Sequence, residues 1–183
     1  IRFLQLFSGY CATGDTREQC FLFLYGMGQT GKGTFLLTLA ELLGDYAALS
    51  AASTFMAANQ EKHSSEIARL SGCRLVVIDE TDGSTRWNEE RLKRMTGGGK
   101  ITAARKYRDE EDIQVTWKLA FAGNHKPALR GVGKEMERRI RLVKCNASIP
   151  DDAVDRNFRA NMIATEGPQI LHWTLQGAVQ WLD

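Results

Sequence analysis

A nine-residue stretch rich in glycine carries the clearest chemistry in this sequence. Residues 26–34 follow the apolar run Phe21–Tyr25 and lead into a helix-patterned segment, 34–43. Between a strand and a helix, glycines let successive N–H groups point inward, and the helix N-terminus adds partial positive charge. Lys32 can reach phosphate oxygens as a mobile point charge. The stretch therefore predicts a loop that binds a nucleoside triphosphate, formed by Gly26, Met27, Gly28, Gln29, Thr30, Gly31, Lys32, Gly33 and Thr34.

One position departs from the usual pattern of such loops. The residue after the lysine is normally Ser or Thr, whose hydroxyl holds Mg²⁺, but Gly33 stands there. Thr34 is one place further on, and one residue turns a helix by about 100°. Either Thr34 reaches the metal through a shifted turn, or water and a downstream carboxylate hold it. The departure leaves the metal ligand open and does not affect the prediction of a nucleotide site.

Two carboxylates follow a second apolar run. Residues 74–78 read as a buried strand, and Asp79 and Glu80 come directly after it. Ligands of open α/β sheets bind at the carboxyl ends of the strands. We expect Asp79 to hold Mg²⁺, directly or through water, and Glu80 to orient the attacking water. A strand that ends in a solvated acidic turn is the alternative.

Polar residues also flank two later strands. Asn124 ends the run 117–122, where an amide can hydrogen-bond the γ-phosphate or the attacking water, although Asn also favours turns. Arg138 and Arg139 precede the run 140–143. An arginine at a subunit edge can reach the γ-phosphate of a neighbour, and a solvated basic face is the alternative.

A charged segment lies between these signals. Residues 100–115 alternate loosely and predict an exposed hairpin. Basic side chains with an aromatic at the tip suit phosphate contacts and base stacking, and a hairpin that is merely solvated is the alternative. The candidate residues for nucleic-acid binding are Lys100, Arg105, Lys106, Tyr107 and Arg108.

A sheet with helices on both faces is needed to position these residues. Continuous apolar runs interleaved with helical patterns predict a three-layer α/β core with a central parallel sheet. After Pro150 two helical patterns follow, the second with Pro168 in its first turn. We therefore expect a phosphate-loop core over residues 1–150 and a C-terminal helical segment, 151–183, packed on it. Four apolar residues recur along one side of the second helix: Leu171, Leu175, Val179 and Leu182.

The composition is that of an ordinary globular protein. The 183 residues are 43% hydrophobic and 25% charged, and a net charge of +2 is too small to indicate nucleic-acid binding by itself. Four scattered cysteines lack the paired spacing of a zinc site and are expected to be buried free thiols in a reducing cytosol. No apolar run reaches membrane-spanning length. The chain begins inside an apolar segment without Met, so we expect it to be part of a longer protein.

The order of these motifs resembles that of superfamily 3 helicase domains, specifically the helicase half of phage and plasmid primase-helicases. The resemblance runs from about residue 6 to the C-terminus and includes residues 44–46, 96–98, 166–168 and 170–173. It implies a P-loop NTPase of the AAA+-like kind that assembles as a ring, usually a hexamer, around a strand of DNA. It also implies ATP-driven 3′ to 5′ translocation, ATP and Mg²⁺ as cofactors, and action in the cytoplasm of a bacterial host for a phage, prophage or plasmid. Whether a primase domain precedes this part of the chain stays open.

The resemblance also implies roles for single residues. Lys32 becomes the phosphate-binding lysine, Asp79 and Glu80 the metal-binding and water-activating acids, and Asn124 the polar sensor. Arg138 or Arg139 becomes the finger presented to the next subunit, with Arg138 preferred. Lys106 and Tyr107 would grip DNA in the channel, supported by Lys100, Arg105 and Arg108. Some members share the glycine of position 33, whereas many carry an acid where Lys100 stands.

Two other functions remain open from the sequence. One is a phosphate-loop ATPase that remodels proteins or a small-molecule kinase, although a kinase has no use for a basic exposed hairpin. The other is an ATP-binding ring that switches without turnover, which Gly33 motivates.

Overall fold

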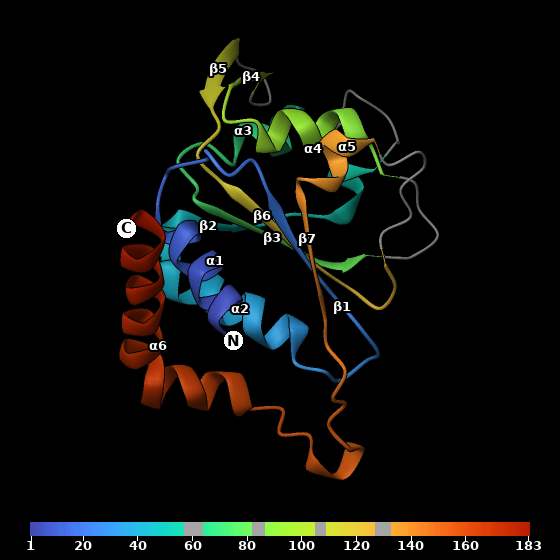
Figure 1. The fold of residues 1–183 in the computed structure, drawn as a ribbon, viewed down its shortest axis with the longest axis vertical. Coiled ribbons are helices and arrows are strands. Elements are labelled where there is room, and N and C mark those ends of the chain that lie inside the picture. The colour runs from blue at the N-terminus through green and yellow to red at the C-terminus, as the bar shows by residue number, and fades with distance from the viewer. Residues whose placement is uncertain (57–63, 82–86, 105–108, 127–132) are drawn as a thin grey trace.

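Five parallel strands form the centre of the fold, in the order β2-β3-β6-β1-β7. The computed structural model describes residues 1–56, 64–81, 87–104, 109–126 and 133–183 (Figure 1). The central strands are β1 (Phe21–Tyr25), β2 (Ala47–Leu49), β3 (Leu75–Thr81), β6 (Lys118–Gly123) and β7 (Ile140–Lys144). The predicted α/β class with a central parallel sheet is confirmed.

Both faces of this sheet are buried, which explains why its strands read as continuous apolar runs. Phe21 and Phe23 of β1 pack into the hydrophobic cluster on one face. Leu22 and Leu24 belong to the cluster on the other face. Because side chains alternate along a strand, a five-residue apolar run supplies both clusters.

Helices cover the two faces, as Figure 1 shows. One face carries α1 (Arg2–Ala12), α2 (Lys32–Leu43) and α6 (Phe158–Leu182), and the other carries α3 (Ser64–Ala68), α4 (Glu89–Thr96) and α5 (Lys134–Glu137). Short 3-10 turns occur at η1 (Gly44–Tyr46), η2 (Ala52–Phe55) and η4 (Asp151–Ala153). Within the described ranges, no helix has the length and apolar character needed to span a membrane.

The charged segment forms the predicted hairpin. Strands β4 (Lys100–Ala104) and β5 (Glu110–Gln114) pair antiparallel as a separate two-stranded sheet at one end of the molecule (Figure 1). Ile101, Ala103 and Ile113 are buried, so one face of the hairpin packs on the core. The tip, residues 105–108, lies outside the described residues.

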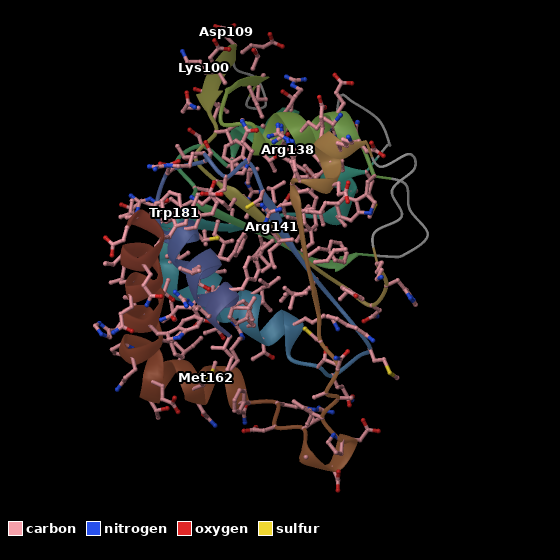
Figure 2. All side chains as sticks on the ribbon, viewed as in Figure 1. Lys100, Asp109, Arg138, Arg141, Met162 and Trp181 are labelled. Carbon is pink, nitrogen blue, oxygen red and sulfur yellow. The ribbon has the colours of Figure 1, made fainter. Side chains whose placement is uncertain are left out.

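The C-terminal segment differs from the prediction of two helices. Residues 158–182 form one helix that runs through Pro168. A proline inside a helix removes one backbone hydrogen bond and bends the axis, and Figure 1 shows α6 bent into two parts. Met162 lies on the first part and Trp181 on the second (Figure 2). Packing on the core holds the second part in place, so the helix continues where its local sequence predicts a break.

The side of α6 that packs is also not the one marked by its leucine pattern. Leu175, Val179 and Leu182 are 48%, 58% and 60% exposed. Gly177 and Trp181 instead lie on the side that contacts α1. The apolar repeat identified the helix correctly but not the face that it buries.

Candidate functional site

The glycine-rich loop joins β1 to α2, as predicted, and its backbone explains its composition. The N–H of Gly26 donates to the carbonyl of Gly123, 3.3 Å away. A Cβ at position 26 would lie 2.2 Å from the carbonyl oxygen of Cys145, so only glycine fits there. Gly31 caps α2 with a φ of 79°, which is in the left-handed region that favours glycine. The loop therefore turns tightly between the strand and the start of the helix.

Lys32 occupies the interior of this loop. Its Nζ donates to the carbonyls of Gly26 at 2.8 Å and Met27 at 2.7 Å, and to Oγ1 of Thr30 at 2.9 Å. The side chain is buried, although α2 begins at this residue. The first N–H groups of a helix have no carbonyl within the helix to bond. The ammonium group of Lys32 and the N-terminus of α2 thus lie at the same turn, which fits the binding of phosphate oxygens.

The order of the strands brings the other polar signals beside this loop. Gly123 pairs with Tyr25 of β1 on one side and with Thr81 of β3 on the other. Asn124 is exposed and follows Gly123 directly. The backbone of β3 includes Asp79 and Glu80, whose side chains lie outside the described part of the structure. The loop follows β1 and the asparagine follows β6, whereas the acidic pair lies within β3, which continues to Thr81 beyond the predicted strand end at residue 78. The three signals therefore lie on three adjacent strands near one edge of the sheet.

Sequence reasoning missed Lys126 as part of this edge. Its Nζ lies 5.6 Å from the centre of the Tyr25 ring, within range of a cation–π contact. Tyr25 is the last residue before the loop, so Lys126 adds a positive charge near the predicted phosphate site. The basic residue two places after Asn124 was the available signal.

The two candidate finger residues have different surroundings. Arg138 is exposed and donates to Oε1 of Gln19 at 3.2 Å. Arg139 is 8% exposed and donates to the carbonyl of Gln19 at 3.2 Å and to Oγ1 of Thr96 at 3.3 Å. Burial, followed by the nearby charge of Arg138, lowers the pKa of Arg139. Arg139 is thus tied into its own chain, whereas Arg138 is accessible.

Both arginines lie far from the loop of their own chain. The N–H of Phe21, the first residue of β1, donates to the carbonyl of Arg139 at 2.8 Å. The loop begins at the other end of β1, about 15 Å away for a five-residue strand. The fold therefore places Arg138 (Figure 2) at the opposite edge of the sheet from the glycine-rich loop of its own chain.

Only part of the predicted nucleic-acid site is described. Lys100 is exposed at the start of β4 (Figure 2). The other candidate residues, Arg105, Lys106, Tyr107 and Arg108, lie outside the described residues. Across the hairpin, Oγ1 of Thr102 donates to Oδ1 of Asp112 at 2.9 Å. The hairpin thus pairs in a defined register below its tip.

A segment after β7 ties the phosphate loop to the C-terminal helix. The N–H of Ile149 donates to the carbonyl of Gln29 at 2.9 Å, and Oγ of Ser148 donates to the carbonyl of Gly28 at 3.1 Å. Nε2 of Gln29 donates to Oδ1 of Asp151 at 2.7 Å. The segment therefore runs along the loop before the chain enters α6.

An apolar cavity of about 500 Å³ opens beside the loop. Its walls come from Gly31 and α2, from Ile149, and from both parts of α6. The sequence did not predict it, because no single stretch of the chain contains its lining.

Known proteins share this fold. The C-terminal region of NrS-1 superposes with a TM-score of 0.69 at 15% identity, covering 94% of this chain and 40% of that one. The JCV helicase superposes with a TM-score of 0.53 at 14% identity, covering 97% of this chain and 53% of that one.

Sequence relatives include the C962R proteins of African swine fever virus, which are named as primases. One is 27% identical over 165 residues, which is 85% of this chain and 16% of that protein. Another is 33% identical over 113 residues, which is 60% of this chain and 12% of that protein. This chain thus spans less than a fifth of the length of these relatives. A family model matches residues 24–139, from the end of β1 to Arg139, and the chain therefore belongs to the family described as "Family of unknown function (DUF5906)".

Proposed function

We propose that this chain is the ATP-driven motor of a replicative DNA helicase of superfamily 3, an AAA+-like P-loop ATPase. It works as a hexameric ring in a cytoplasm, moves 3′ to 5′ along a strand of DNA, and forms the helicase part of a longer phage or plasmid primase-helicase. The observation that carries the proposal is the order of β1, β6 and β3 in the sheet. This order places the loop of Lys32, Asn124 and the strand that contains Asp79 and Glu80 next to one another at one edge.

The similar proteins support a role in replication. The C962R relatives are named as primases, and one of the proteins with this fold is named as a helicase. Both kinds of protein act on nucleic acid. A motor domain that accompanies a primase is consistent with a chain that matches 16% of such a relative.

The glycine-rich loop supports the proposal of nucleotide binding. The ammonium group of Lys32 already donates to two carbonyls and one hydroxyl of the loop. Phosphate oxygens carry more negative charge than these acceptors, so Lys32 exchanges loop contacts for contacts with the β- and γ-phosphates. Free N–H groups at the start of α2 bind the same phosphates.

The acidic pair performs the hydrolytic chemistry. Asp79, together with Thr34 or water, would hold Mg²⁺, which would supply positive charge to neutralise the charge that develops on the phosphates. Glu80 orients the attacking water and polarises it. Asn124, at the end of the strand between β1 and β3, hydrogen-bonds the γ-phosphate or that water.

Assembly supplies the last group. Arg138 is exposed and lies at the edge of the sheet away from its own loop, so it serves the site of the next subunit as a finger. ATP closes this interface because the γ-phosphate binds Asn124 and the neighbour's Arg138. Closure moves the hairpin along the channel, and hydrolysis releases it, so that each cycle draws the strand by one step.

The test is ATP hydrolysis with and without single-stranded DNA, at high protein concentration, with the assembly state followed by light scattering. We expect DNA to stimulate turnover in the assembled ring. Lys32→Ala and Arg138→Ala should each lower turnover at least about 100-fold, since both remove charge that stabilises the transition state. Arg141→Ala is a matched control, because Arg141 is a nearby arginine that donates to carbonyls of its own chain.

One result would overturn the proposal. Turnover in an assembled ring that ignores DNA and persists in Arg138→Ala and in Arg139→Ala would exclude a shared helicase site. It would favour an ATPase with a different substrate.

A further inference from the structure

The apolar cavity beside α2 continues directly from the phosphate loop. Gly31 and Thr34 belong both to the loop and to the cavity wall. Its volume of about 500 Å³ lies within the range of small-molecule sites, about 300–1,000 Å³. Phe158 and Ile149 on the wall remain 54% and 45% exposed, so the described part of the chain leaves much of these apolar side chains uncovered.

The lining suits a flat heteroaromatic group and not a phosphate. Three of its side chains are aromatic, namely Phe35, Phe158 and Trp173. Burying a charge against apolar walls is unfavourable, whereas ring faces stack well on one another. Once the loop holds the phosphates, the cavity is the adjoining space that can accept the base of the same nucleotide.

Thr38 adds a polar group to this wall. It lies one helical turn after Thr34, is 3% exposed, and its hydroxyl has no hydrogen-bond partner among the described residues. Three other helical threonines each donate to the carbonyl four residues earlier: Thr96, Thr165 and Thr174. A buried hydroxyl without a partner is unfavourable, and a rotation about χ1 exchanges the positions of its oxygen and methyl group.

We propose that this cavity binds the purine base of the nucleotide and that Thr38 hydrogen-bonds the edge of that base; the inference rests on the proposed function. A hydroxyl both donates and accepts, so it bonds an amino group or a carbonyl of a purine equally well. Gln169 at the mouth carries an amide with the same dual capacity. The affinities of the site for ATP and GTP should therefore differ by no more than about threefold. The site binds CTP more weakly, because the single ring of a pyrimidine contacts less of the apolar wall.

The experiment measures binding of ATP, GTP, CTP and inorganic tripolyphosphate to the full chain by calorimetry. Thr38→Val keeps the shape of the side chain and removes the hydroxyl. We expect this variant to lower the affinity for ATP and GTP about fivefold and to leave the affinity for tripolyphosphate unchanged. Thr174→Val is the matched control, since Thr174 is a buried helical threonine outside the cavity.

Tryptophan emission gives a second measurement that does not depend on a variant of Thr38. Trp173 lines the cavity, so ATP should change the emission while tripolyphosphate should not. Trp173→Phe should remove that difference.

The outcomes separate the two proposals. Three results together would overturn the base site and leave the phosphate-binding role of the loop intact. Tripolyphosphate would bind and lose that binding in Lys32→Ala, Thr38→Val would bind ATP as tightly as the wild type, and ATP would not change the emission of Trp173. Failure of the wild-type chain to bind ATP or tripolyphosphate would overturn both.

Discussion

A buried lysine shows how a single residue joins distant parts of this fold. Lys118 begins β6 and is 1% exposed. Its Nζ donates to the carbonyls of Thr13, Asp15 and Thr116 and lies 4.7 Å from the centre of the Tyr10 ring. The ammonium group therefore fixes the turn after α1 to the central sheet. Burial lowers the pKa of Lys118 from 10.5 to about 8.

We predict that Lys118 makes stability rise with pH in the alkaline range. Below pH 8 the lysine is charged in the folded and unfolded states, and the folded state bears the cost of burying the charge. Between pH 8 and 10.5 the folded protein loses the proton first, so that cost disappears. Relative to Lys118→Met, the wild-type free energy of unfolding should rise by up to about 3 kcal/mol over this interval.

Urea denaturation of both proteins from pH 7 to pH 10.5 tests this. The difference between the unfolding free energies of the two proteins removes the contribution of Cys11 and Tyr10, which titrate in both. Burial raises the pKa of each of these groups. Parallel pH profiles would show that the Lys118 ammonium group is not destabilised by burial.

At the scale of elements, the packing of α6 on α1 depends on two glycines. A Cβ at Gly9 would lie 2.0 Å from the backbone nitrogen of Ala178, and one at Gly177 would lie 2.1 Å from the carbonyl oxygen of Gln5. Nε2 of Gln5 also donates to the carbonyl of Trp173 at 3.1 Å. The two backbones approach so closely that neither helix can carry a side chain at the crossing.

Gly177→Ala should therefore destabilise the protein although alanine favours helix. The added methyl group meets backbone atoms that cannot move without separating the helices, and we expect a loss of about 3 kcal/mol or more in the free energy of unfolding. Gly167→Ala in the same helix is the control, because its Cβ would meet only side-chain atoms, at 3.4 Å or more. It should be neutral or stabilising by up to about 1 kcal/mol. Equal losses in both variants would argue against the close crossing.

In the whole molecule, the hairpin and the sheet edge that carries the glycine-rich loop are separate regions that share one hydrophobic core. Ile101 and Ala103 of the hairpin belong to the same hydrophobic cluster as Phe23 of β1, which leads into the phosphate loop. Figure 2 shows Lys100 and Asp109 on the hairpin at one end of the molecule. If the chain is the motor proposed above, this arrangement predicts that it can lose its contacts with DNA and still hydrolyse ATP.

Lys106→Ala should thus retain basal ATPase within about twofold and lose unwinding. The proposed function has the hairpin contact DNA phosphates, so DNA stimulation should also fall steeply as salt rises, whereas basal turnover should not. Lys134→Ala, at an exposed lysine of α5 away from the hairpin, is the control. Equal loss of both activities in Lys106→Ala would count against a DNA-binding role for the hairpin.

Features that depend on a few neighbouring residues could be predicted from the sequence. The glycines at positions 26 and 31 supply the backbone freedom that the turn before α2 requires, and the apolar runs 21–25 and 75–78 are strands buried on both faces. The alternating segment after Gly99 is a hairpin. Such patterns follow from turn chemistry and side-chain periodicity, which act over a few residues.

Burial by a distant part of the chain could not be predicted, even for two adjacent residues of the same type. Arg138 and Arg139 are adjacent in sequence, yet only Arg139 is buried, because Thr96 and the carbonyl of Gln19 approach it. The helix runs through Pro168 because α1 packs against its second part. Thr38 lines a cavity because α6 returns to α2 from the far end of the chain. Burial depends on contacts between segments far apart in sequence, which no local pattern specifies.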